Sequence, residues 1–557
     1  MRWIDSRRIT GPHLLVPAQG AAVEVALSDD EDVDDAVARV RTRLEAVHRA
    51  LGWGGTGVPL RVGARPWDAR PADAPLAPGQ VAGAGVSIAW CAPPDLLETA
   101  CLGLEMAVDD AVDLDALRAS AAGEANPALR RCVVTAEAHG WPWMVDEDGF
   151  TLGTGRFART WPLDALPDAL VAPEGRIPVA LVTGTNGKTT TSRLLARMAR
   201  AAGRVDGLTS SDAIAVGGTI VARGDWSGPG AARRVLRDPA VELAVLETAR
   251  GGLLRRGLAL ADADVAVVTN ISDDHFGEYG VSTLAGMAEA KLSVAAGLRP
   301  GATLVVNARS ALLLAALPEL RARRPDLRVV TFDDDGADGV VLGDGLLRWE
   351  DVPVTFGGRA RHNVENALAA VAAARVLGVA EEAIAVALRG FRPDLADSAG
   401  RMNLVERDGV RILLDFAHNP DGIRRLAPVV DGLGPGRRLL VIGQAGDRTD
   451  ALLSAFAASA AGLRCDRYVV KEMAAYARGR VPGEVPARLE AGLRAAGVPS
   501  AAIVRAADDV DAARQALAWA RPGDVLVLLV HADLDGVRAL LDGEATGVVS
   551  SIGPETA

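Results

Sequence analysis

The sequence predicts a multidomain α/β protein whose central domain begins with a phosphate-binding loop. At 557 residues the chain exceeds what one hydrophobic core supports, and we expect three domains. Short and nearly continuous apolar runs, such as residues 178–183 and 264–270, alternate with helical stretches, as buried parallel strands do. The segment VTGTNGKTTTSR (182–193) joins one such run to a helix through two glycines.

Residues 1–170 are predicted to form a mixed α/β domain that acts in acceptor binding or docking. Apolar patterns indicate strands at 22–27 and 85–90, and helical spacing indicates helices at 32–52 and 94–112. We find no catalytic motif in this domain. Three prolines and a glycine between 166 and 178 predict a linker after it.

Residues 171–398 are predicted to form a doubly wound, mostly parallel sheet with strands at 178–183, 242–247, 264–270 and 302–307. A break is expected between 391 and 401. Residues 399–557 then form a smaller, Rossmann-like α/β domain. Its predicted strands lie at 411–416, 437–443, 466–472 and 524–530.

Composition narrows the class of protein. The hydrophobic fraction of 49% and the charged fraction of 24% are those of a globular protein. No apolar run is long enough to cross a bilayer, and the N-terminus lacks the apolar region of a secretory signal, so we expect a cytoplasmic protein. Four scattered cysteines favour neither a disulfide framework nor a zinc site. A net charge of -12, spread along the chain, argues against nucleic acid as a partner. The sequence leaves open whether the chain forms a homo-oligomer.

Lysine is scarce. Only Lys188, Lys291 and Lys471 occur among 60 basic residues, so arginine serves nearly every other cationic position. The three lysines are therefore candidates for positions that need a compact ammonium or a reactive amine. Seven of the eight asparagines fall between residues 186 and 419, which marks the same region for close attention.

The segment 182–193 departs from the common phosphate-binding motif, which places four residues between its glycines. Here only Thr185 and Asn186 separate Gly184 from Gly187. A strand before the loop and a helix after it still provide the backbone amides and helix dipole that hold phosphate. Lys188 is predicted to reach the β- and γ-phosphates and Thr189 to ligate magnesium. The alternative is a turn that contains Gly-Lys-Thr by chance.

Further candidates follow the neighbouring strands. Glu247 ends one strand and is placed to hold Mg²⁺, although a solvated loop glutamate is the simpler interpretation. The next strand leads into an acidic loop with four candidates for metal or phosphate contact: Asn270, Asp273, Asp274 and His275. A structural role for His275 is the alternative.

Lys291 lies on the apolar face of a helix predicted at 282–298, with Ser282 or Thr283 as N-cap. It is either a lysine whose ammonium extends to solvent or a reactive amine that forms a carbamate with CO₂.

Six ordered motifs give the chain a resemblance to a known family: GTNGKTTT, ETARGGLLRRGL, TNISDDHFGEYG, RHNVENALAA, SAGRMNLVE and LLDFAHNPDG. Over roughly residues 178–480 the sequence resembles the Mur ligases, and within them the Mur-ligase half of cyanophycin synthetase. The short glycine spacing is the form that this family uses.

The resemblance implies three domains, with ATP and two Mg²⁺ ions bound between the central and C-terminal ones. It implies nucleotide contacts from Gly184, Thr185, Asn186, Gly187, Lys188, Thr189, Thr190, Asn366, Arg401 and Asp415. It implies that Lys188, Glu247, His275 and Lys291 are catalytic, that Thr189, Glu247, His275 and Lys291 are metal ligands, and that Lys291 is the residue carbamylated in many members. His418, Asn419, Asp447, Arg448 and Glu472 are implied to bind substrate.

The implied reaction is ATP-dependent amide formation through an acyl phosphate, joining an amino-acid amine to an aspartyl or peptide-like carboxylate. A folylpolyglutamate-type or peptidoglycan-type ligase, an inactive nucleotide-binding regulatory module and a P-loop NTPase coupled to motion are the alternatives. Acidic residues of the C-terminal loops (Asp447, Asp450, Glu472 and Glu484) are candidates to receive a guanidinium. About 170 residues precede the loop, so we expect no ATP-grasp domain.

Overall fold

The computed structural model describes residues 1–28, 31–53, 85–272, 279, 281, 283–395 and 397–543. They form two compact units. The first holds the described residues up to Val352 together with His362–Phe391, and the second holds Pro353–Arg361 and the described residues from Arg392 onward. The division into three domains at 170 and 398 stays a prediction.

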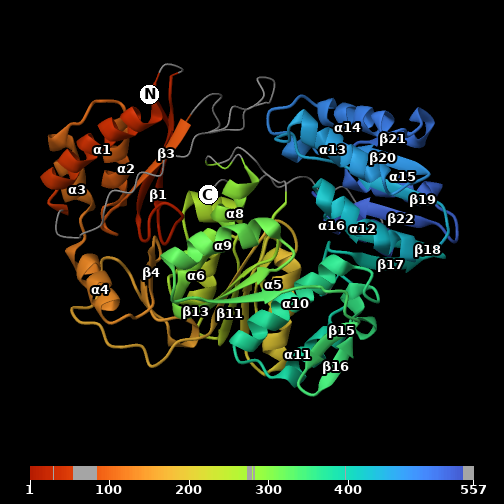
Figure 1. The fold of residues 1–557 in the computed structure, drawn as a ribbon, viewed down its shortest axis with the longest axis horizontal. Helices are drawn as coiled ribbons and strands as arrows, with labels where there is room; N and C mark the ends of the chain where they lie inside the picture. Colours follow the sequence, from red (N-terminus) through yellow and green to blue (C-terminus); the bar gives the residue numbers. More distant parts are fainter. Residues whose placement is uncertain are drawn as a thin grey trace. The chain divides into compact units, whose positions relative to one another are not determined.

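The first unit begins with an antiparallel sheet in the order β1-β2-β3, with strands β1 (Arg2–Ile9), β2 (Gly20–Ala26) and β3 (Gly85–Cys91). Helices α1 (Val33–Ala50) and α2 (Leu97–Val108) pack against it, and α3 (Leu114–Glu124) packs against α2 (Figure 1). Val23, Leu44 and Trp90 are buried between sheet and helices. Ala22, on the opposite face of β2, is buried as well, so both faces of this strand are covered.

A small antiparallel sheet with one helix follows. It consists of α4 (Pro127–Ala138), β4 (Trp143–Asp146), β5 (Gly149–Leu152) and β6 (Arg159–Trp161). Arg237, at the end of α6 (Pro229–Arg237), binds Asp146 through Nη2 over 2.6 Å and Thr151 through Nε over 2.8 Å. These contacts attach the small sheet to the rest of the first unit.

The central sheet has the strand order β10-β9-β8-β11-β7-β12-β13-β14. Its strands are β7 (Val179–Thr183), β8 (Asp206–Thr209), β9 (Ala213–Val216), β10 (Thr219–Arg223), β11 (Leu243–Glu247), β12 (Ala263–Val268), β13 (Leu298–Asn307) and β14 (Arg328–Phe332). The six neighbouring strands β8-β11-β7-β12-β13-β14 all pair in parallel. Strands β9 and β10 extend the sheet beyond β8 and pair antiparallel. The four predicted strands are thus adjacent, as β11-β7-β12-β13.

Helices cover both faces of this sheet. Helix α5 (Lys188–Ala201) packs on β7, β8 and β11, and against α11 (Glu381–Gly390). A second core joins β7, β11, β12 and β13 to α6 (Pro229–Arg237), α7 (Arg250–Arg255), α8 (Leu284–Leu292) and α9 (Ala311–Arg323). The hairpin of β15 (Gly339–Leu342) and β16 (Gly345–Arg348) and helix α10 (Arg361–Val376) complete the central part. The predicted doubly wound, mostly parallel sheet is confirmed. The loops after β7, β11 and β12 therefore lie at one edge of the sheet.

The second unit contains a sheet in the order β17-β18-β22-β19-β20-β21. Only β17 runs antiparallel among these described strands. Its strands are β17 (Asn403–Arg407), β18 (Val410–Asp415), β19 (Arg438–Ile442), β20 (Arg467–Lys471), β21 (Ile503–Ala506) and β22 (Val525–Leu529).

The core residues of this sheet divide between its two faces. One core includes α12 (Pro420–Gly432), α13 (Asp450–Ala461) and α14 (Glu484–Ala495), and the other includes α15 (Asp509–Trp519) and α16 (Leu534–Asp542). The predicted smaller α/β fold is confirmed. Among the described helices, none has the length and apolar character needed to span a membrane.

Candidate functional site

The loop between β7 and α5 depends on both of its glycines. Gly184 has φ +143°, and a Cβ built on it would lie 1.8 Å from the Thr269 hydroxyl oxygen. Gly187 has φ +85°, and its Cβ would lie 2.0 Å from Oδ1 of Asn366. Only glycine fits this backbone and this closeness. The shortened spacing thus belongs to a loop held tightly between β12 and α10.

The end of β12 holds this loop through Asn270 and Thr269. The Asn186 carbonyl accepts bonds from Thr269 Oγ1 over 2.7 Å and from Asn270 Nδ2 over 2.9 Å. The side-chain and main-chain oxygens of Asn270 accept the Asn186 and Thr185 amides, each over 2.9 Å. Asn270 therefore matches donors and acceptors of the loop backbone and fixes its conformation.

Two of the three lysines meet at the same loop. Lys188 Nζ donates to the carbonyl oxygens of Gly184 and Thr185, over 3.2 and 3.0 Å. Lys291 is only 4% exposed, and its Nζ donates to the Gly184 oxygen over 2.9 Å. Two ammonium groups therefore lie beside the start of α5, where backbone amides and the helix dipole already favour an anion.

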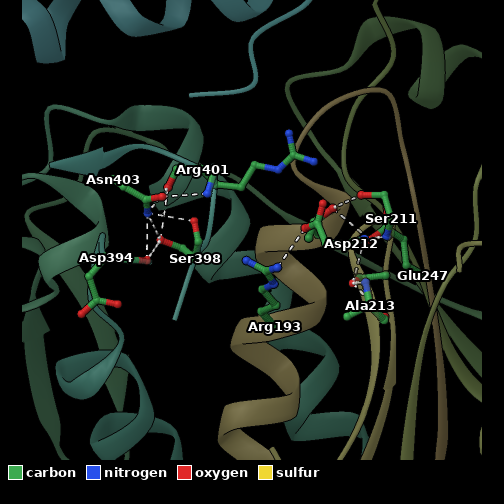
Figure 2. Close-up of polar contacts among 12 residues, drawn as sticks. Arg193, Ser211, Asp212, Ala213, Glu247, Asp394, Ser398, Arg401 and Asn403 are labelled. Atoms are coloured by element: carbon green, nitrogen blue, oxygen red, sulfur yellow. Dashed lines mark hydrogen bonds and ion pairs between the residues drawn. The ribbon is translucent and has the colours of Figure 1, made fainter. Parts of the chain in front are cut away.

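Oxygen atoms gather on the other side of the helix start. Glu247, buried at the end of β11, accepts the Thr189 hydroxyl through Oε2 over 2.9 Å and the Ser211 amide over 3.3 Å. The hydroxyl oxygens of Ser211 and Thr189 are 3.1 Å apart. Figure 2 shows the contact of Ser211 with Glu247 and the ion pair of Arg193 with Asp212, whose Nη2 and Oδ2 are 2.8 Å apart.

This oxygen set fits Mg²⁺, which prefers hydroxyl, carboxylate and water ligands. Thr189 and Glu247 were both predicted as ligands. Within the described residues, no group of three or more His, Cys, Asp or Glu side chains lies together as a metal site. Asp273, Asp274 and His275, the other predicted contacts in this region, lie outside the described residues.

Asp415 joins two loops at the end of β18 in the second unit. Its carboxylate accepts the Met402 amide over 2.9 Å and the Ala417 amide over 2.8 Å. Burial raises the pKa of the Asp415 carboxyl above its ordinary value, against the opposing charge of Arg401. The Arg401 guanidinium lies over the Phe416 ring, 4.2 Å from its centroid.

Asn403 fixes the segment that carries Arg401. Its Nδ2 donates to the carbonyl oxygens of Asp394 and Ser398 over 2.8 and 2.9 Å, and its Oδ1 accepts the Gly400 amide over 2.7 Å (Figure 2). The side chain is fully buried. The positions of Arg401 and Asp415 therefore depend on side chains that satisfy the backbone of their own loops.

Family models match both parts of the chain that carry these loops. Residues 182–374 match the Mur ligase middle domain, and residues 400–529 match the Mur ligase glutamate ligase domain. The chain belongs to the Mur ligase family. The predicted resemblance is confirmed.

Relatives of this Mur ligase include cyanophycin synthetases. That of Trichormus variabilis is 37% identical over 374 residues, which cover 64% of this chain and 41% of the relative. That of a Synechocystis species is 39% identical over 340 residues, covering 56% of this chain and 39% of the relative. The chain thus spans about two-fifths of the length of these relatives.

Two further matches lie elsewhere in the family. UDP-N-acetylmuramate–L-alanine ligase of Renibacterium salmoninarum is 32% identical over 318 residues, covering 54% of this chain and 63% of the relative. A solved structure of E. coli FolC in complex with ADP shares the fold. It has a TM-score of 0.50 and 21% identity, and the match covers 66% of this chain and 89% of that one.

The remaining predicted nucleotide contacts, Thr190 and Asn366, lie in the first unit of the Mur ligase. Thr190 follows Thr189 in the buried first turn of α5. Asn366 lies on α10, where its Nδ2 donates to Asn363 Oδ1 over 3.1 Å and its Oδ1 faces Gly187. The structure thus brings Asn366 to the phosphate loop.

The predicted substrate residues already have partners within the second unit. Asn419 caps α12 by accepting the Gly422 amide over 2.8 Å, and the His418 carbonyl accepts Gln444 Nε2 over 2.9 Å. The Glu472 carboxylate accepts the backbone amides of Met473 and Gly483.

The other carboxylates predicted to receive a guanidinium form ion pairs with arginines of the chain itself. Asp447 pairs with Arg478, while Asp450 and Glu484 pair with Arg480. The Arg448 carbonyl also accepts Arg480 Nη2, over 2.7 Å. These loops are therefore held together by internal ion pairs.

The third lysine of the Mur ligase, Lys471, forms an ion pair that stabilises the fold. Lys471 ends β20, is fully buried, and pairs with Asp509 at the start of α15. Burial lowers the pKa of Lys471, against the opposing charge of Asp509. Asp509 also accepts the Ala532 and Asp533 amides, over 2.7 and 3.0 Å. A compact ammonium therefore balances a carboxylate that fixes the loop after β22.

Two residues of the site were missed from sequence. Thr269 and Ser211 follow strands at the edge that carries the phosphate loop, and this position was the available signal.

Helix α8 begins at the N-cap Thr283, which accepts the Gly286 amide over 3.0 Å and was one of the two predicted caps.

Proposed function

We propose that the chain is an ATP-dependent ligase that joins a carboxylate to an amine through an acyl phosphate. The amine would be an amino acid and the acceptor an aspartyl or peptide-like carboxylate, as the similarity to cyanophycin synthetases suggests. One observation carries the proposal. Lys188 and Lys291 meet at the Gly184 carbonyl, while Thr189 and Glu247 bond to each other at the start of the same helix.

A carboxylate reacts poorly with an amine in water, so the proposed chemistry first activates it by phosphorylation. A carboxylate oxygen attacks the γ-phosphorus of ATP, the bond to the bridging oxygen breaks, and ADP leaves with the electron pair. The amine nitrogen then attacks the acyl carbon and expels phosphate, and the amine loses a proton. Lys188 would offset the charge that develops on the γ-phosphoryl oxygens.

Thr189 and Glu247 would hold Mg²⁺, together with His275, which lies outside the described residues. When bound, the ion neutralises charge on the phosphate oxygens and orients them. A carbamylated Lys291 would replace an ammonium with an anion that can serve a second ion. Without the carbamate, Lys291 would act through the Gly184 carbonyl and hold the loop.

The remaining assignments are part of the same proposal. Asn366, Arg401 and Asp415 would contact the nucleotide, with Gly184, Thr185, Asn186, Gly187 and Thr190 holding its phosphates. His418, Asn419, Asp447, Arg448 and Glu472 would serve the incoming amine. A cytoplasmic location, where ATP and free amino acids are available, completes the proposal.

The alternative within the class is a folylpolyglutamate-type or peptidoglycan-type ligase. The 32% identity to UDP-N-acetylmuramate–L-alanine ligase keeps it open. An inactive nucleotide-binding regulatory module is the other alternative. Against it, Lys188, Thr189, Glu247 and Lys291 are all present, with both lysines on the Gly184 carbonyl and Thr189 bonded to Glu247.

A substrate panel tests the proposal. The chain is incubated with ATP, Mg²⁺, single amino acids and aspartyl peptides, and products are identified by mass. We expect one amine and acceptor pair to gain the mass of an amide bond with release of phosphate. A product formed only with folates or muramyl peptides would move the assignment to the alternative.

A further inference from the structure

A polar cavity of about 440 Å³ lies in the first unit, away from the phosphate loop. Its walls come from β1, α2, α3 and the end of α7, and none of its lining residues belongs to the loop 184–187 or to the start of α5. Its volume falls in the range of small-molecule sites, about 300–1,000 Å³. Arg255 and Arg256 lie within the motif ETARGGLLRRGL, but the ligase assignment gives neither residue a role.

Four arginines line the cavity, and one of them, Arg7, is paired with Glu24. Arg8 comes from β1, Arg255 is the last residue of α7, and Arg256 is its C-cap. Arg8 pairs with Glu98, with Nη1 and Oε1 2.7 Å apart. In the described part of the chain, neither Arg255 nor Arg256 has a carboxylate within ion-pair distance.

Hydrogen bonds to backbone carbonyl oxygens hold these arginines together. Arg256 Nη1 donates to the Arg8 carbonyl over 3.3 Å, and the Arg256 carbonyl accepts the Thr10 amide over 2.8 Å. The turn after α7 is therefore attached to β1, and the like charges of Arg8 and Arg256 cannot easily separate.

No described carboxylate of the cavity forms an ion pair with Arg255 or Arg256. Glu98 is taken up by Arg8, Asp5 lies 3.3 Å from Arg7, and Glu105 accepts the Ser6 hydroxyl. Burial, with the neighbouring charges of Arg8 and Arg255, lowers the pKa of Arg256 against the opposing charge of Glu98. Burial also raises the pKa of the Cys101 thiol to about 12, so this side of the cavity adds no negative charge at neutral pH.

We propose that this cavity binds a small anion with carboxylate or phosphate oxygens, held by Arg255 and Arg256 with Arg8 beside them. A guanidinium offers paired N–H donors that match the oxygens of a carboxylate or phosphate. An anion there would relieve the repulsion among three like charges held close together. The proposal goes beyond the ligase assignment and does not depend on it.

Calorimetric titration of the full chain tests the site. Succinate and inorganic phosphate serve as probes at low ionic strength, because screening weakens partly exposed charges. We expect saturable binding of at least one probe to the wild type, and binding about tenfold weaker or more in the double variant Arg255→Gln/Arg256→Gln. Arg321→Gln is the matched control, because Arg321 is exposed on α9, outside the cavity. It should bind as the wild type does.

The two probes separate the ligand classes. A loss confined to succinate indicates a carboxylate ligand, and a loss that includes phosphate indicates a phosphate-bearing one. Phosphate binding that survives in the double variant belongs to another site, such as the phosphate loop. No saturable binding of either probe, or equal affinities in wild type and double variant, would overturn the proposal.

A second variant guards against a folding defect. The Arg255 side chain is exposed and has no hydrogen bond in the described part of the chain, so Arg255→Gln should fold as the wild type does. It should still bind the probe several-fold more weakly. Thermal unfolding gives an independent readout, because the probe should raise the wild-type midpoint more than that of Arg255→Gln. Equal shifts would contradict the proposal.

Discussion

Lys188 and Lys291 donate to the same atom, the carbonyl oxygen of Gly184, over 3.2 and 2.9 Å. In a chain with three lysines, two therefore meet at one turn of the backbone. Two compact ammonium groups on flexible side chains can reach the same carbonyl oxygen from different directions, whereas two planar guanidinium groups would crowd each other. This convergence explains why arginine has not replaced lysine here.

Replacing Lys188 should remove catalysis. We expect Lys188→Ala to lower kcat for ADP formation by on the order of 10²–10³, because in the proposed mechanism Lys188 offsets the charge on the γ-phosphoryl oxygens. Lys188→Arg should fail as well, since a guanidinium cannot reproduce the compact contacts to Gly184 and Thr185. Steady-state ADP release measures both, with Arg321→Ala as control. Near-wild-type turnover by Lys188→Ala would refute the assignment.

Lys291 tests the carbamate directly. Lys291→Ala should lose activity that bicarbonate cannot restore, whereas short-chain carboxylates such as acetate should restore part of it by replacing the carbamate anion. If Lys291 only braces the Gly184 carbonyl, no carboxylate will help, because a carbonyl oxygen needs a donor. The activity of the variant across acetate and propionate concentrations distinguishes these outcomes.

Gly187 should tolerate no side chain. Gly187→Ala combines an unfavourable positive φ, about 1–2 kcal/mol, with a Cβ placed 2.0 Å from Asn366 Oδ1. Gly203→Ala is the matched control, because its φ is +77° and nothing lies within 4 Å of the added Cβ. Denaturant unfolding should show a larger loss at Gly187 than at Gly203. Adding Asn366→Ala should recover the difference due to the clash, and equal losses at both glycines would contradict the geometry.

His531 should make stability depend on pH. Its Nε2 lies 3.2 Å from the Ala417 carbonyl, and its ring meets Phe416 edge to face. Burial, with the nearby charges of Lys471 and His418, holds the pKa of His531 well below 6.5 in the folded chain. The unfolded chain then binds more protons below about pH 6.5, so stability falls as the pH drops, by at most about 1.4 kcal/mol per pH unit.

Unfolding of wild type and His531→Gln at several pH values measures this slope. The wild type should lose more stability than the variant between about pH 7.5 and about pH 5.5. Asp415, whose pKa burial raises, titrates in both proteins and cancels in the difference. Identical pH profiles would show that His531 does not titrate as described.

The sequence predicted the central fold because its signals are local. Four apolar runs became β7, β11, β12 and β13, and neighbouring strands end at one edge of a parallel sheet whatever the loops do. The turn between β7 and α5 was likewise predictable, since its two glycines and the residues that start the helix are adjacent in sequence. Phosphate binding by this turn stays a prediction.

Contacts between distant residues could not be predicted in the same way. Nothing local shows that Asp509 takes up Lys471, or that the Asn186 carbonyl needs Thr269. Glu472 and Asp447 were assigned to substrate by their loops, yet each has backbone or arginine partners that only the folded chain supplies. Tertiary pairing decides whether a polar residue serves the fold or is available to a ligand.

The dependence of ADP release on both substrates tests the central claim most directly. ATP turnover is measured with the amine alone, with the acceptor alone and with both, each in the presence of Mg²⁺. The account predicts sustained ADP release only when both are present, with one amide formed per ADP. Steady ATP hydrolysis without acceptor or amine, unchanged when they are added, would contradict a ligase and indicate an NTPase.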